Sequence, residues 1–152
     1  MESERQFRIL LASNPQNEVA LNNLACLVED MGRETEAETL YEKALVLNPD
    51  YVEARNNYGV LLCKRKQYTA GIEQMEAATL SRPSCLPPHY NLGKAYFEVG
   101  NHQAAVRHWE RYLKQDASRS AWVLRAERHV EEARNRLAAS RSDPDNVSGK
   151  SR

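Results

Sequence analysis

The chain has 152 residues, enough for one domain with its own core, so neither disulfides nor a metal ion are needed to stabilise it. Lysine plus arginine and aspartate plus glutamate both number 21, a balance that argues against nucleic acid or an anionic membrane surface as the partner. No stretch approaches the roughly 20 apolar residues that span a bilayer, and the charged start is unlike a secretion signal. Three cysteines without a C-x-x-C pair favour reduced thiols. We expect a cytoplasmic protein with no membrane insertion and no cofactor.

A period of about 34 residues organises most of the sequence. Prolines recur at this step, and three aligned segments carry a large residue followed directly by a small one. These pairs are Leu24-Ala25, Tyr58-Gly59 and Leu92-Gly93. Small residues let two helices approach closely, and apolar residues recur three and four apart within each segment. The pattern therefore predicts three helical hairpins.

The expected ends of the helices follow the same period. Gly32 and Gly100 lie where a left-handed residue would end the first helix of repeats one and three. Lys66 occupies that place in repeat two, so its turn is expected either to carry a small strain or to close differently. Pro49 and Pro83 are expected to end the second helices, because the residue before proline is driven out of helical geometry.

These segments resemble the tetratricopeptide-repeat family. The best local matches are His89-Tyr-Asn-Leu-Gly-Lys-Ala-Tyr96, Asn22-Asn-Leu-Ala25 and Glu36-Ala-Glu-Thr-Leu-Tyr-Glu-Lys-Ala-Leu45. The resemblance implies an all-α fold, a right-handed α-solenoid of helical hairpins with about eight helices. We expect a single domain over residues 1–139, with a half-repeat helix (3–15), three repeats (18–51, 52–85 and 86–117), a C-terminal capping helix (118–139) and a disordered tail (140–152).

The two flanks fit this frame. The first helix places Phe7 where repeat one has Tyr41, so the chain opens halfway through a unit. Whether this is a natural cap or the start of a piece of a longer protein stays open. The capping helix is expected to bury one apolar stripe, made of Trp122, Ala126, Val130, Ala133 and Leu137.

Catalytic motifs are missing from the sequence: it has no phosphate-binding glycine loop, no H-E-x-x-H helix and no nucleophile elbow. Two pairs of residues have the side chains of metal ligands, Cys85 with His89 and His102 with His108, but a metal site needs about four converging ligands. We expect no enzyme activity, no catalytic residue and no metal.

An asparagine directly precedes the large residue of each aligned pair, at Asn23, Asn57 and Asn91. The first helix of each pair lines the inner curve of such a stack, so these side chains are expected to point into its groove. A carboxamide carries donors and an acceptor and can pair with the main chain of an extended peptide whatever its sequence. The row resembles the asparagine ladder of O-linked N-acetylglucosamine transferase. The alternative is that these amides bond between adjacent helices.

The same helical phase adds further groove-lining candidates. They are Asn22, Asn56, Tyr90, Cys26, Val60, Lys94 and Phe97. Cys26 and Cys63 have two interpretations: a redox-sensitive pair of thiols, or two small side chains that simply line the groove. The basic clamp of the chaperone-tail-binding members of the family is matched by Asn57 but not at the other positions.

The sequence thus predicts an adaptor or scaffold that binds an extended peptide or a helix of a partner protein in the concave groove. Two alternatives remain. One is a structural protein that associates with itself, as a homodimer that buries Trp122. The other is a factor like the type IV pilus assembly lipoproteins, which the stretch Arg55-Asn-Asn-Tyr-Gly-Val-Leu-Leu-Cys63 resembles.

Overall fold

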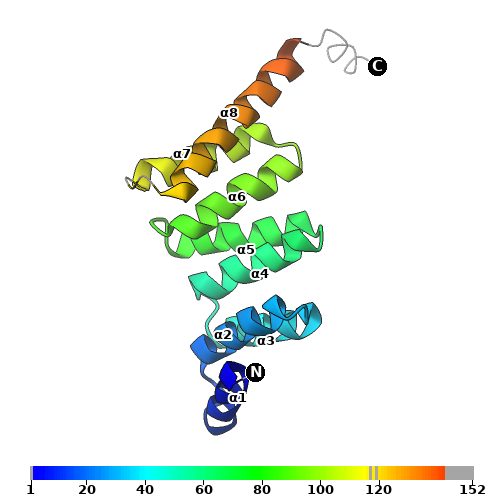
Figure 1. Cartoon of the computed structure of the whole chain (residues 1–152), viewed down its shortest axis with the longest axis vertical. Helices are drawn as coiled ribbons and strands as arrows, with labels where there is room; N and C mark the ends of the chain where they lie inside the picture. The colour runs from blue at the N-terminus through cyan, green and yellow to red at the C-terminus, as the bar shows by residue number, and fades with distance from the viewer. Residues whose placement is uncertain (1, 117, 119, 143–152) are drawn as a thin grey trace. The chain divides into compact units, whose positions relative to one another are not determined.

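All regular structure in the described part of the chain is α-helical (Figure 1). The computed structural model describes residues 2–116, 118 and 120–142. Its helices are α1 (Glu2–Ser13), α2 (Glu18–Asp30), α3 (Glu34–Leu47), α4 (Val52–Lys64), α5 (Tyr68–Ser81), α6 (Leu86–Glu98), α7 (His102–Gln115) and α8 (Ala121–Ser142). The predicted all-α fold of helical hairpins is confirmed.

The chain divides into two compact units, and the boundary falls between Pro88 and His89 in the first turn of α6. In a stack of hairpins each element contacts mainly its sequence neighbours, so such a division is common in repeat folds. That residues 1–139 form a single domain stays a prediction. α8 continues through Ser142, so residues 140–142, expected to belong to a disordered tail (140–152), are helical instead. Residues 143–152 lie outside the described residues.

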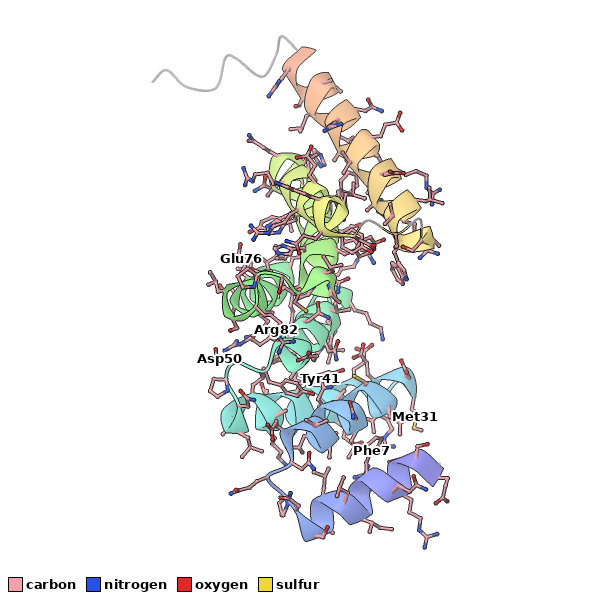
Figure 2. All side chains as sticks on the ribbon, turned by 90° about the vertical axis from the view of Figure 1, so that its left-hand side faces the viewer. Phe7, Met31, Tyr41, Asp50, Glu76 and Arg82 are labelled. Carbon is pink, nitrogen blue, oxygen red and sulfur yellow. The ribbon has the colours of Figure 1, made fainter. Side chains whose placement is uncertain are left out.

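The first unit contains the hairpins α2–α3 and α4–α5, with α1 packed on α2. Its core is formed by the apolar faces of these amphipathic helices. Fully or almost fully buried members include Leu24, Val28, Tyr41, Leu61 and Met75. Phe7 of α1 packs against this core, and Figure 2 shows it beside α2. α1 therefore completes the apolar cover of the first hairpin.

Three inter-helix turns use the same left-handed backbone conformation. Gly32 has φ 78° and Gly100 has φ 77°, as the sequence predicts. Lys66, between α4 and α5, has φ 62° and is the one non-glycine residue with positive φ in the described part of the chain. A side chain at such a position costs about 1–2 kcal/mol relative to glycine. The turn of repeat two therefore has the same backbone conformation as the other two turns, with the strain of a side chain at positive φ.

Hydrogen bonds at this turn explain why Lys66 accepts the conformation. The Lys66 amide donates to the Cys63 carbonyl over 2.9 Å, and the Gln67 amide donates to the Leu62 carbonyl, also over 2.9 Å. This is the pattern of a Schellman cap, which satisfies carbonyl groups that the helix end would otherwise leave without partners. The gain from these bonds offsets the strain at Lys66.

The second unit consists of most of α6 together with α7 and α8. Trp109 of α7 is its largest buried side chain, and its indole Nε1 donates to the carbonyl of Tyr90 over 3.1 Å. His129 of α8 stacks on this indole, with ring centroids 4.9 Å apart. Gly93 faces the same ring so closely that a methyl group there would overlap it. The small residue predicted at this register is thus required by the indole.

The buried stripe of α8 differs from the predicted one at its first position. Val123 is buried, whereas Trp122 is 54% exposed. Ala126, Val130 and Ala133 are buried as expected. The ring of Trp122 instead stands nearly perpendicular to that of Tyr90, with centroids 5.3 Å apart. Adjacent helix residues point about 100° apart, so the shift by one position turns the indole to the margin of the contact.

Candidate functional site

Four asparagine side chains form one hydrogen-bonded series on α2 and α4 of the first unit. Asn56 Nδ2 donates to Asn57 Oδ1 over 3.2 Å, and Asn57 Nδ2 donates to Asn22 Oδ1 over 3.2 Å. Asn22 Nδ2 then donates to Asn23 Oδ1 over 3.3 Å. We call these four residues the asparagine series. The bond between Asn57 and Asn22 joins neighbouring repeats, so the alternative of amides that bond between helices applies to this pair.

Local sequence explains why α2 and α4 present these residues. Asn17 caps α2, because its side chain accepts a hydrogen bond from the Ala20 amide over 2.9 Å. At α4 the Arg55 guanidinium donates to the Pro49 carbonyl over 2.6 Å and to Gln74 Oε1 over 2.7 Å. The start of each helix is therefore fixed, which sets the rotation of the side chains that follow.

A partly buried polar cluster lies next to the series. The Tyr41 hydroxyl is 3.1 Å from Glu29 Oε2 and 3.3 Å from Cys26 Sγ, and Figure 2 labels Tyr41 on α3. A hydroxyl has one proton and a carboxylate is the stronger acceptor, so Tyr41 donates to Glu29. Burial raises the pKa of Glu29 above its ordinary range, and the Tyr41 hydrogen bond partly opposes this rise. The cluster ties α2 to α3 directly behind the series.

Cys26 belongs to both groups. Its Sγ accepts from Asn57 Nδ2 over 3.3 Å, and burial raises the pKa of the thiol. A raised pKa reduces the thiolate fraction, which makes the sulfur a poorer nucleophile. The thiol of Cys63 lies against Gly71 of α5, where an added Cβ would be 2.5 Å from its Sγ. These contacts direct the two thiols toward different helices and give no support to a redox pair.

Ionic contacts lie at the C-terminal end of α2. Lys64 Nζ is 3.0 Å from Glu34 Oε1 and 3.9 Å from Glu29 Oε1. About half of the Lys64 side chain remains exposed to solvent. The fixed charges beside the asparagine series are therefore partly balanced within the protein.

The predicted site residues differ in exposure and in the unit to which they belong. In the first unit Asn23 is exposed, Val60 is 36% exposed, and Asn57 and Cys26 are half-buried. Asn22 and Asn56 are buried, so within the series they act as supports. In the second unit Lys94 is exposed, and Asn91 and Phe97 are half-buried.

Tyr90 is 6% exposed, which differs from the expectation of a groove-lining side chain. Its ring meets Tyr112 at a centroid distance of 5.4 Å and Trp122 at 5.3 Å. The first turn of α8 therefore covers the phenol. Phe97 is tilted against His102 and Trp109, with centroids 4.9 and 5.9 Å away. The rings of Tyr90 and Phe97 therefore both pack against other aromatic side chains of the second unit.

Two arrangements were not predicted from the sequence. One is the contact of Tyr41 with Glu29, for which a signal existed: a buried tyrosine needs a partner for its hydroxyl, and the other two repeats have Met75 and Trp109 in its place. The other is the contact between His89 and His108, whose Nδ1 atoms are 3.3 Å apart. The sequence alone suggests other pairings, His89 with Cys85 and His108 with His102.

Further properties of the described residues bear on the class of protein. They contain no group of three or more His, Cys, Asp or Glu side chains able to hold a metal ion. No helix among them has the length and apolar character required to cross a bilayer.

Comparison with known proteins identifies the fold family. The model of the tetratricopeptide repeat matches residues 2–141. Protein FlbA of Caulobacter vibrioides is 26% identical over 106 residues, which are 70% of this chain and 18% of that protein, so the chain spans less than a fifth of this curated relative.

Solved structures share the fold at low sequence identity. A MamA protein has a TM-score of 0.77 at 21% identity, with 89% of this chain and 72% of that chain covered. The first repeat domain of Spaghetti (RPAP3), bound to an HSP90 peptide, has a TM-score of 0.75 at 18% identity, with 81% and 94% covered. YrrB, a protein with an unusual peptide-binding site, has a TM-score of 0.73 at 19% identity, with 91% and 75% covered. The match over residues 2–141 shows that this chain belongs to the tetratricopeptide-repeat family, whose fold suggests a scaffold for protein–protein interaction.

Proposed function

We propose that this chain is an adaptor that binds an extended segment of a partner polypeptide along the face of α2 and α4 in the first unit. The observation that carries the proposal is the asparagine series, because it brings an exposed carboxamide, Asn23, and a half-buried one, Asn57, onto adjacent first helices. An extended peptide presents unpaired N–H and C=O groups, and carboxamides bind both.

Neighbouring side chains support this proposal. Val60 follows Asn57 by one helical turn and is 36% exposed, which leaves an apolar surface for a side chain of the partner. Lys64 lies one further turn along α4 with about half of its side chain exposed. Cys26, half-buried beside Asn57, adds a small polarizable surface. This mixture suits a peptide with an apolar anchor better than a ligand of high charge.

The second unit offers equivalents of these residues. Asn91, Lys94 and Phe97 are at least partly accessible on α6. We propose that Asn91 binds a partner main chain within the second unit, and Asn91→Ala alone tests this contribution separately. We also propose that the chain acts without catalysis or a cofactor. Since its three cysteines are all thiols, the cytoplasm is the compartment that suits it.

The test begins with a displayed library of random peptides selected on the immobilised full chain. Affinities of the selected peptides, made synthetically, are then measured by calorimetry for the wild type and for a variant with Asn23→Ala and Asn57→Ala. Each neutral hydrogen bond contributes about 1 kcal/mol, so the double variant is expected to bind at least about tenfold more weakly.

The matched control carries Lys43→Ala and Glu73→Ala, which truncate exposed side chains on α3 and α5. Circular dichroism must show equal helicity for all three proteins. Failure to enrich any peptide, or equal affinity of the double variant and the wild type, would contradict the proposed function.

Self-association is a second candidate, and the exposed face of α8 favours it. Trp122 and Leu124 are 54% and 57% exposed. A shallow cavity of about 580 Å³ on the same helix is lined by Ala121, Leu124, Arg125, Glu127, Arg128 and Glu131. Light scattering over a concentration series decides this point. A dimer mass that reverts to a monomer mass in Leu124→Glu would favour the second candidate.

A further inference from the structure

The hydrogen bonds of the asparagine series all run in one direction. Each member donates through Nδ2 to the Oδ1 of the next, from Asn56 to Asn57, then to Asn22, and finally to Asn23. Because each amide is both donor and acceptor, the orientation of one fixes the orientation of its neighbour. The series therefore has a direction, and the two accessible amides lie at different places along it.

Asn57 has used its donor capacity inside the protein. A carboxamide has two N–H donors, and those of Asn57 are directed to Asn22 Oδ1 at 3.2 Å and Cys26 Sγ at 3.3 Å. Its Oδ1 accepts one bond, from Asn56, and a carbonyl oxygen has a second lone pair. What Asn57 can still offer to a ligand is an acceptor.

Asn23 has the opposite capacity. Its Oδ1 accepts the bond from Asn22, whereas its Nδ2 donates to no group in the described part of the chain. Asn23 is an exposed residue, which leaves room for a ligand to reach its carboxamide. What Asn23 offers to a ligand is chiefly a donor.

We propose that the two residues bind opposite groups of the partner's main chain: Asn23 donates to a backbone carbonyl and Asn57 accepts from a backbone N–H. This inference rests on the proposed function and adds a rule of specificity to it. The partner residue whose N–H faces Asn57 cannot be proline, which has no N–H to donate. The partner is thus an extended segment with a non-proline residue at one defined position.

The series also explains why the Asn57 amide does not rotate by itself. If the Asn57 amide rotated by half a turn, its Oδ1 would face Asn22 Oδ1, and two acceptors would then oppose each other. Its Nδ2 would likewise face the Nδ2 of Asn56. The buried partners therefore hold Asn57 ready before the ligand arrives, which reduces the entropic cost of binding.

A backbone substitution tests the role of Asn57. In a peptide selected on the full chain, each amide is replaced in turn by an ester, which removes one N–H without adding bulk. At one position the ester is expected to weaken binding to the wild type by about fivefold, the effect of one neutral hydrogen bond. The same ester is expected to have no effect on binding to Asn57→Ala, because the acceptor is already missing.

A side-chain substitution tests the role of Asn23. Asn23→Asp keeps the oxygen that accepts from Asn22 and replaces the outward donor with an acceptor, so binding is expected to weaken by about tenfold or more. Asn135→Asp, at an exposed site on α8, adds the same charge and is expected to bind like the wild type.

The outcomes separate this inference from the proposed function. If no ester position depends on Asn57, or if Asn23→Asp binds like the wild type, the division of roles is wrong. The proposed function still stands in that case, provided that the double alanine variant loses binding. If the double alanine variant binds normally, both fail.

Discussion

Gly59 of α4 and Gly71 of α5 lie in direct backbone contact: a Cβ on Gly59 would be 2.8 Å from the Gly71 carbonyl oxygen, and a Cβ on Gly71 would be 2.7 Å from the Gly59 carbonyl oxygen. Real Cβ atoms essentially never approach other atoms so closely. The hairpin that carries Asn57 on its first helix therefore depends on the absence of side chains at two positions.

We predict that Gly71→Ala destabilises the protein. Alanine favours a helix over glycine by about 1 kcal/mol, but overpacking against Cys63 and the Gly59 backbone costs about 1–3 kcal/mol. The net loss in the free energy of unfolding is expected to be up to about 2 kcal/mol, measured by urea denaturation. Thr69 is exposed on the same helix, so Thr69→Ala raises helix propensity without overpacking. This control is expected to stabilise the protein slightly. A gain in stability for Gly71→Ala would contradict the observed contact.

We predict that Lys66→Gly stabilises the protein. Lys66 has φ 62°, a conformation that costs a side chain about 1–2 kcal/mol, while glycine adds some entropy to the unfolded chain. The net gain is expected to be about 1 kcal/mol and appears as a higher urea midpoint at unchanged m-value. Lys66→Ala keeps the Cβ and serves as the control, with an expected change near zero.

Much of the fold could be predicted because the repeat period fixes several features together. The large and small residues at Tyr58 and Gly59, and the left-handed turns at Gly32 and Gly100, recur in register, so each one supports the others. The capping helix has no repeat with which to align. Its stripe was therefore assigned from apolar residues alone, which favoured Trp122 over its smaller neighbour Val123.

The candidate site was predicted less completely. The sequence places Asn23 and Asn57 in register, but the direction of the asparagine series depends on side-chain rotamers and on the approach of α2 to α4. The burial of Asn22 and Asn56 follows from the same packing. Tyr90 was misplaced because the helix that covers it lies outside the repeats. Whether these residues bind a partner stays a prediction.

We predict that Trp122 stabilises the second unit although it is half-exposed. Its edge contact with Tyr90 is of a kind that contributes about 0.5–1.5 kcal/mol, so Trp122→Ala is expected to lower the free energy of unfolding by about 1 kcal/mol. Leu124→Ala is the control, because Leu124 is similarly exposed but lies two residues further along α8 and so points to another side of the helix. Little change in the free energy of unfolding is expected for this variant. Equal effects of the two substitutions in urea denaturation would show that the ring contact contributes nothing.

We predict that His129 makes stability fall on acidification. Burial lowers the pKa of this imidazole below its ordinary value, nearby Lys94, Arg128 and Arg125 lower it further, and Glu132 opposes them. The unfolded chain therefore takes up a proton at a higher pH than the folded chain does. This contribution is fully present above the ordinary histidine pKa of about 6.5 and is lost as pH falls toward the lower folded value.

The variant His129→Phe keeps an aromatic ring on Trp109 and removes the titrating group. The chain has three other histidines, so the informative quantity is the difference in the free energy of unfolding between wild type and variant, followed from neutral pH downward. That difference is expected to shift in favour of the variant as pH falls. An NMR titration in which His129 protonates at or above the ordinary value would overturn the prediction, because a raised pKa in the folded state would make acid stabilising.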